Sequence, residues 1–91
     1  MKIHLLAAFL ATALGFILGI SRVEWGLLCF AIFLVLAAET ANTALEKVVD
    51  LVTAEYHPLA RNAKNAAAGA VLLSAINAVI MAFIIFGRYL F

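Results

Sequence analysis

The chain has 91 residues, of which 68% are hydrophobic and 12% charged, with a mean hydropathy of +1.19. A soluble domain of this length cannot hide so large an apolar fraction in one core, so the composition indicates a membrane protein. Six Lys and Arg against five Asp and Glu give a formal charge of +1, which provides no basic surface and argues against a nucleic-acid partner.

The first apolar segment covers residues 3–20 and begins MKIHLLAAF. A cleaved signal peptide is the alternative interpretation, but the apolar body is long and no A-x-A-like cleavage site follows it. The next residues, SRVEW, are typical of a tight turn between two spans. We therefore expect a retained membrane helix.

The second apolar segment, residues 26–38, reads GLLCFAIFLVLAA and is followed directly by ETANTALEKVVD. Thirteen uncharged helical residues cover only about 20 Å, so Glu39 should lie near the boundary between lipid and water. Gly and Pro are absent from Leu27 to His57, which predicts a continuous helix through Asp50.

Polar side chains share one face of this predicted helix. At about 100° per residue they fall within an arc of about 100°. We call this set the polar ladder: Glu39, Asn42, Thr43, Glu46, Asp50 and Thr53. The following stretch, TAEYHPLARNAKN, contains Pro58 and is predicted to be a surface connection or a short interfacial helix.

The third apolar segment starts at Ala66, so the spans are placed at about 3–20, 26–52 and 66–88 in one all-α domain of residues 1–91. Four basic residues fall on one side and two on the other, which predicts that the N-terminus and the 47–65 connection are cytoplasmic. Trp25 and Tyr89 are expected at the opposite boundary. The basic residues are Lys2, Lys47, Arg61 and Lys64, against Arg22 and Arg88.

The polar ladder contains the groups that phosphoryl transfer needs. Desolvation at an apolar boundary favours the neutral carboxylic acid, so Glu39 can exchange a proton near neutrality and serve as general base for an alcohol. Glu46 is an oxygen ligand suited to Mg²⁺, and Asn42 can orient either carboxylate. Lys64 offers a positive charge for phosphates.

Two other interpretations of the ladder stay open on the pattern alone. The face could simply be solvated where the helix leaves the membrane, or it could form part of a proton or ion path. His57, which stands beside a proline, is more typical of a turn than of a ligand set.

The segments ETANTALEKVVDLV, EYHPLARNAKN and AAAGAVLL resemble the bacterial integral-membrane diacylglycerol kinase family. The motif of that family is roughly E-x-x-N-[ST]-A-x-E-x-x-V-D, followed by E-x-H-x-x-A-x-x-A-K-D and a helix of small residues. The match covers about Glu39 to Leu73.

The resemblance implies a homotrimer in the bacterial inner membrane that transfers the γ-phosphate of ATP, with Mg²⁺, to a lipid hydroxyl at sites formed between subunits. Glu39 falls on the catalytic base of the family and Glu46 on its metal and nucleotide ligand. The segment DLVTAEYHPLA is most similar to the branch of the family that phosphorylates undecaprenol rather than diacylglycerol. The nucleotide-binding positions correspond to Asn42, Glu46, Asp50, Glu55, Tyr56, His57, Lys64 and Asn65, and Ala68 corresponds to a small position beside the lipid.

Two departures from the family pattern bear on activity. Asn65 stands where the family has Asp, and an N-terminal metal-binding glutamate of the family has no counterpart before Ile3. Asn65 is expected to lower the affinity or selectivity for nucleotide, and the missing glutamate is expected to lower the affinity for Mg²⁺. The alternative expectation is a weakened or inactive homologue that acts as a non-enzymatic membrane oligomer.

Overall fold

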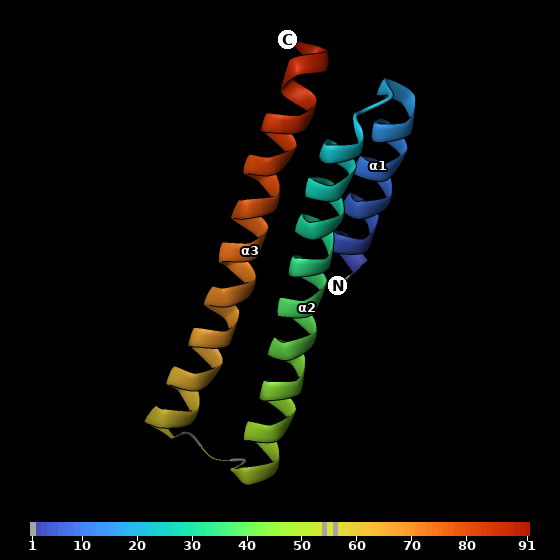
Figure 1. Cartoon of the computed structure of the whole chain (residues 1–91). Helices are drawn as coiled ribbons and strands as arrows, with labels where there is room; N and C mark the ends of the chain where they lie inside the picture. Colours follow the sequence, from blue (N-terminus) through green and yellow to red (C-terminus); the bar gives the residue numbers. More distant parts are fainter. Residues whose placement is uncertain (1, 54, 56) are drawn as a thin grey trace.

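The computed structural model describes residues 2–53, 55 and 57–91 and shows an all-α protein. Three helices run antiparallel to their chain neighbours: α1 (Lys2–Leu18), α2 (Arg22–Val52) and α3 (Pro58–Leu90). The bundle measures 51 × 18 × 17 Å. Its long axis follows α2 and α3, while α1 lies beside the first part of α2 (Figure 1).

The connection between α1 and α2 is a tight turn, as SRVEW predicts. Gly19 has a φ of +65°, a left-handed conformation that glycine adopts without a Cβ penalty. Ser21 then caps α2 with a capping box, in which its side chain accepts from the Glu24 backbone N–H and the Glu24 carboxylate accepts from the Ser21 N–H. The turn therefore ends the first apolar helix at Leu18, two residues before the predicted limit.

The long α2 helix confirms the predicted continuity through Asp50 and ends at Val52. It begins four residues before the predicted span of 26–52, because the Ser21 cap starts the helix within the turn. Two threonine hydroxyls donate to carbonyls of α2: Thr40, beside the polar ladder, to Leu36 at 2.8 Å, and Thr43, within the ladder, to Glu39 at 3.0 Å.

The connection between α2 and α3 is shorter than the sequence suggests. The stretch TAEYHPLARNAKN does not form a separate surface segment, because α3 begins at Pro58 and continues without a break to Leu90. His57 is the N-cap, with its Nδ1 accepting from the Leu59 N–H at 3.1 Å. Proline in the first helical turn has no N–H to satisfy, so Pro58 starts the helix rather than interrupting it.

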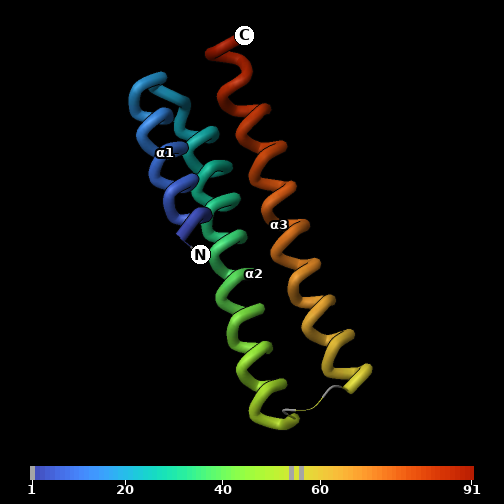
Figure 2. Tube along the Cα trace, turned by 180° about the vertical axis from the view of Figure 1, so that it is seen from behind, coloured from blue at the N-terminus to red at the C-terminus, as the bar shows by residue number. Residues whose placement is uncertain are grey.

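The best-buried side chains gather where the α1–α2 turn meets the last turns of α3. Ile85 is 1% exposed and packs with Ile20, Leu28 and Phe86. In α1, Gly15 is buried against Trp25, whose ring also stacks at a tilt on Phe16 with centroids 4.8 Å apart. The tube view shows that α2 and α3 continue well beyond the N-terminal end of α1 (Figure 2). The core is therefore concentrated at the end of the bundle away from the α2–α3 connection.

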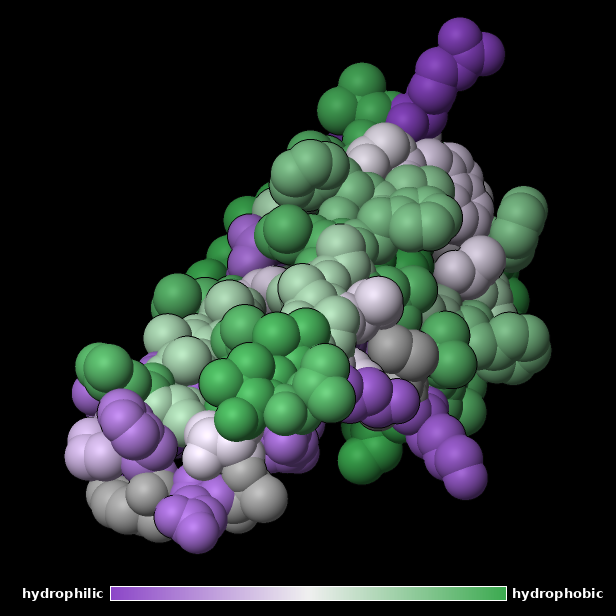
Figure 3. Space-filling model, turned by 90° about the horizontal axis from the view of Figure 1, so that it is seen from below, coloured by the Kyte–Doolittle hydropathy of each residue, from purple (hydrophilic) through white to green (hydrophobic). Residues whose placement is uncertain are grey.

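The surface agrees with a membrane protein. Large apolar side chains are exposed along all three helices, among them Phe9, Phe33 and Phe83, each close to 70% exposed. Within the described chain, α2 and α3 are long and apolar enough to cross a membrane, whereas α1 has 17 residues and is shorter. Hydrophilic side chains gather at the α2–α3 connection (Figure 3).

Candidate active site

The polar ladder lies on the part of α2 that extends toward the connection with α3. Glu39 and Asp50 are separated by about 16 Å along the helix axis. Between them, the Asn42 amide Nδ2 donates to Glu46 Oε1 at 3.3 Å, one turn apart. This bond orients the Glu46 carboxylate, as expected for a pair at i and i+4. Asn42 is half-buried and Glu46 is exposed.

At the apolar end of the ladder, Glu39 lies against the first turn of α1. His4 Nδ1 is 3.0 Å from Glu39 Oε2, and the side chains are 28% and 15% exposed respectively. This contact places the beginning of α1 level with Glu39.

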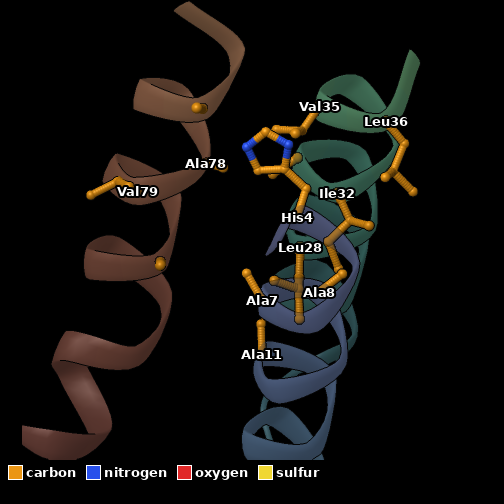
Figure 4. A pocket seen from close by; sticks show the side chains of 13 residues that line it. His4, Ala7, Ala8, Ala11, Leu28, Ile32, Val35, Leu36, Ala78 and Val79 are labelled. Carbon is orange, nitrogen blue, oxygen red and sulfur yellow. The ribbon is translucent and has the colours of Figure 1, made fainter. Parts of the chain in front are cut away.

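Below His4 lies an apolar cavity of about 340 Å³ between the three helices. Figure 4 shows the imidazole of His4 at the Val35 end of this cavity, with Ala11 at the other end. Glu39 follows Val35 by one helical turn, so the cavity ends beside the ladder. The other lining residues are Ala7, Ala8, Leu28, Ala31, Ile32, Leu36, Ala75, Ala78, Val79 and Ala82.

At the polar end of the ladder, α2 and α3 are joined by an ion pair. Lys64 Nζ lies 2.7 Å from Asp50 Oδ1, with side chains 39% and 65% exposed. The structure therefore brings together two residues that the sequence assigns to nucleotide binding, and it pairs them with each other. A nucleotide phosphate that binds Lys64 would have to share its ammonium group with Asp50 or displace the Asp50 carboxylate from it.

The other predicted nucleotide-binding residues lie at or just beyond the connection. Glu55 is exposed, and its backbone N–H donates to Thr53 Oγ1 at 3.3 Å. His57 uses Nδ1 to cap α3, which confirms its role in a turn. Tyr56 lies outside the described residues. Asn65 is exposed on α3.

Ala68, the predicted position beside the lipid, lies on α3 one turn beyond Lys64 and is exposed. It does not line the apolar cavity, whose α3 residues begin at Ala75. The structure therefore leaves Ala68 on an open face of α3.

A divalent cation fits this ladder only as a site shared with phosphate. Among the described residues, no group of three or more His, Cys, Asp and Glu side chains could hold a metal ion by itself. Asn42 Oδ1 is buried without a hydrogen-bond partner in the described part of the chain, next to the Glu46 carboxylate that its amide contacts. Mg²⁺ is commonly held by one or two carboxylates together with substrate phosphates and water, so this oxygen set is compatible with it.

Sequence comparison identifies the relatives of this site. The sequence profile of the prokaryotic diacylglycerol kinases matches residues 1–86, which include every ladder position and Lys64. The chain belongs to the prokaryotic diacylglycerol kinase family.

Individual relatives carry two kinds of name. The chain is 40% identical over 85 residues to undecaprenol kinase of Bacillus subtilis, an alignment covering 93% of this chain and 69% of that protein. It is 43% identical over 67 residues to diacylglycerol kinase of Helicobacter pylori, covering 74% of this chain and 49% of the relative. The match to Escherichia coli diacylglycerol kinase is 38% identical over 74 residues, covering 81% and 61%. The chain thus spans about half to two thirds of the length of these relatives.

Sequence reasoning missed His4 as part of the site. The signal was a histidine in the first turn of an apolar helix, on the same predicted side of the membrane as Glu39. It also missed the cluster at the other end of the bundle, where Tyr89 donates to Glu24 Oε1 at 2.5 Å and Arg88 Nε lies 3.9 Å from Glu24 Oε2. The sequence predicts Tyr89 at the membrane boundary, and the structure adds that its hydroxyl donates to Glu24 on α2.

Proposed function

We propose that the chain is an ATP-dependent lipid kinase that transfers the γ-phosphate to the hydroxyl of a membrane lipid. The observation that carries the proposal is the position of Glu39, between an apolar cavity on one side and a series of polar groups on the other. A lipid chain and a nucleotide can approach this carboxylate from opposite directions. Membership of the prokaryotic diacylglycerol kinase family supports the same activity.

Three residues of the polar ladder, together with Lys64 on α3, have defined parts in the proposed reaction. Glu39 accepts the proton of the lipid hydroxyl as the hydroxyl oxygen bonds to the γ-phosphorus of ATP, the bond from that phosphorus to the β–γ bridging oxygen breaks, and ADP leaves. The Lys64 ammonium group binds phosphate oxygens by charge, and its contact with Asp50 is then lost. Glu46 and Asn42 would hold Mg²⁺, which supplies neutralisation of phosphate charge when bound.

The remaining nucleotide-binding positions are assigned by the family resemblance. They are Glu55, Tyr56, His57 and Asn65, of which Glu55 and His57 lie between α2 and α3 and Asn65 lies within α3. Ala68 is placed beside the lipid. An exposed surface at the polar end of the bundle is compatible with a nucleotide that arrives from water.

We favour undecaprenol over diacylglycerol as the acceptor. The sequence segment DLVTAEYHPLA and the similarity to an undecaprenol kinase over 93% of this chain support this choice. A comparison of both lipids as acceptors in the same mixed micelles tests it. Faster transfer to diacylglycerol at equal mole fraction would reverse the preference.

The chain is proposed to form a homotrimer in the bacterial inner membrane, with three spans per chain and with the N-terminus and residues 47–65 in the cytoplasm. Extensive exposed apolar surface on the single chain is compatible with both lipid and subunit contacts. Chemical crosslinking in mild detergent measures the subunit number. A monomer or a dimer as the largest product would contradict the trimer.

Radiolabel transfer from ATP to lipid in mixed micelles tests the activity itself. Glu39→Gln preserves shape and removes the base, so transfer should fall by about 100- to 10,000-fold while the oligomer stays intact. Glu24→Gln is the matched control, because it makes the same chemical change at the opposite end of the bundle. Wild-type turnover in Glu39→Gln would remove Glu39 from the role of base.

A second candidate is an inactive homologue that serves as a membrane oligomer. The pairing of Lys64 with Asp50 and the presence of Asn65 favour it, since both reduce the charge available to phosphate and metal. Amine labelling separates the two candidates. A kinase should show Mg²⁺-dependent protection of Lys64 by ATP, with Lys2 and Lys47 as internal controls, whereas an inactive oligomer should show none.

A further inference from the structure

The contact between His4 and Glu39 joins two helices at the reactive end of the site. His4 is in the first turn of α1, while Glu39 lies near the middle of α2. Their 3.0 Å contact is the point where the beginning of α1 reaches the polar ladder. His4 is therefore not a distant surface residue but a neighbour of the proposed base.

The surroundings of His4 restrict its motion. Its side chain is 28% exposed, and its ring closes one end of the apolar cavity beside Val35 (Figure 4). Ala8 on α1 and Ala78 on α3 line the same cavity, and their methyl groups cannot hydrogen-bond to the imidazole of His4. Glu39 is thus the polar partner toward which the Nδ1 side of this ring is directed.

We infer that His4 is a positioning residue for the proposed kinase reaction, holding the Glu39 carboxylate in the orientation that receives the lipid hydroxyl. This inference rests on the proposed function. The imidazole of His4 reaches one carboxylate oxygen of Glu39 from α1, so it restricts the rotation of the Glu39 side chain. A base must lie within hydrogen-bond reach of the proton it removes, and a displacement of about 1 Å can cost about 100-fold in rate.

The position of His4 also links substrate entry to the base. A lipid chain that occupies the apolar cavity contacts the same imidazole that contacts Glu39. Binding of the apolar part of the substrate therefore packs the ring against Glu39. The role predicted for His4 is in turnover rather than in affinity for nucleotide, because the Asp50 and Lys64 pair lies about three helical turns away along α2.

Kinetics of His4 variants test this role. His4→Leu keeps an apolar cavity wall and removes the imidazole nitrogen that contacts Glu39, so kcat should fall by about 10- to 100-fold while the KM for ATP stays within about threefold. His4→Gln retains a side-chain N–H donor and should recover most of kcat. Thr12→Val is the control on the same helix, because Thr12 bonds only to the Ala8 carbonyl of α1 in the described contacts.

Two results would overturn the inference. One is His4→Leu with the kcat of the wild type. The other is a loss of kcat that His4→Gln does not recover and that accompanies loss of the folded oligomer in size-exclusion chromatography, which would make the histidine a merely structural contact.

A readout without turnover separates this inference from the proposed function. The ¹⁵N resonances of the two imidazoles report their contacts, with His57 as the internal control. Glu39→Gln should shift the His4 signals, and Glu46→Gln should not. If the wild-type chain transfers no phosphate, the proposed function is wrong and His4 has no positioning role in it. The spectra still show whether His4 contacts Glu39. Unchanged His4 signals in Glu39→Gln would refute the inference in an active enzyme.

Discussion

Lys64 Nζ on α3 lies 2.7 Å from Asp50 Oδ1 on α2, and this ion pair joins the two long helices next to their connection. Both side chains are partly exposed, at 39% and 65%. Ion pairs in such positions typically contribute only about 0 to 1 kcal/mol to stability because solvent screens them. The pair therefore contributes little to holding the two helices together, and a phosphate could displace Asp50 from Lys64 at small cost to the stability of the fold.

Substitution of Lys64 should separate binding from stability. In Lys64→Met the free energy of unfolding should change by less than about 1 kcal/mol. The KM for ATP should rise by about 10- to 100-fold, since hydrogen bonds to charged groups are worth about 1.5 to 3 kcal/mol. Thermal unfolding in micelles and ATP titration of lipid phosphorylation measure the two effects. A large loss of stability with an unchanged KM would show that the pair is structural.

At the opposite end of the bundle, Tyr89→Phe should destabilise the fold and spare the chemistry. The Tyr89 hydroxyl donates to Glu24 Oε1 at 2.5 Å, and Glu24 is only 8% exposed. Its removal leaves a buried carboxylate short of one donor, which costs about 1 to 3 kcal/mol. The melting temperature in micelles should fall accordingly, while kcat of the folded protein stays near the wild-type value.

Arg88→Gln is the companion variant for this cluster. Arg88 Nε is 3.9 Å from Glu24 Oε2, and its side chain is 65% exposed. Its loss should therefore cost less than about 1 kcal/mol. If Arg88→Gln lowers the melting temperature more than Tyr89→Phe does, charge rather than the hydroxyl holds α2 to α3.

Gly15→Ala should weaken the packing of α1 on α2. A Cβ at this position would lie 2.9 Å from the Trp25 ring and 3.1 Å from Ile20 Cδ1, so neighbours in the core must shift. Overpacking of this kind costs about 1 to 3 kcal/mol, which exceeds the gain of about 1 kcal/mol from replacing a helical glycine. Differential scanning calorimetry of the protein in micelles should show a lower melting temperature.

Gly26→Ala is the matched control in α2. A Cβ there meets nothing within 4 Å in the single chain, so only the gain in helix propensity should remain. Stabilisation by both substitutions would mean that Trp25 moves away without cost. Destabilisation by Gly26→Ala would indicate that this face is packed in the assembled protein.

The sequence predicted well those features that depend on local chemistry. The continuity of α2 followed from the absence of Gly and Pro from Leu27 to His57, and the turn at SRVEW followed from its position between two apolar segments. The start of α3 was missed because Pro58 was interpreted as a break, although proline is favoured in the first turn of a helix.

The contacts of the site depend on how helices far apart in sequence are placed beside one another. Periodicity showed that the ladder residues share a face, but it could not reveal that His4 would reach Glu39 or that Lys64 would pair with Asp50. Both contacts depend on the lengths of helices that end at turns. A shift of one residue in either turn would rotate the partner by about 100° and remove the contact.

Asn65→Asp should increase the affinity for nucleotide. Asn65 is exposed on α3 next to Lys64, so a carboxylate at this position can be placed without burial or strain. An ionised acceptor can bind Mg²⁺ with its oxygens, whereas an amide offers one weaker oxygen. The KM for ATP measured at limiting Mg²⁺ should therefore fall by several-fold, and the difference should narrow as Mg²⁺ approaches saturation. A higher KM at every Mg²⁺ concentration would instead show that added negative charge repels phosphate, and that the amide at this position favours nucleotide binding.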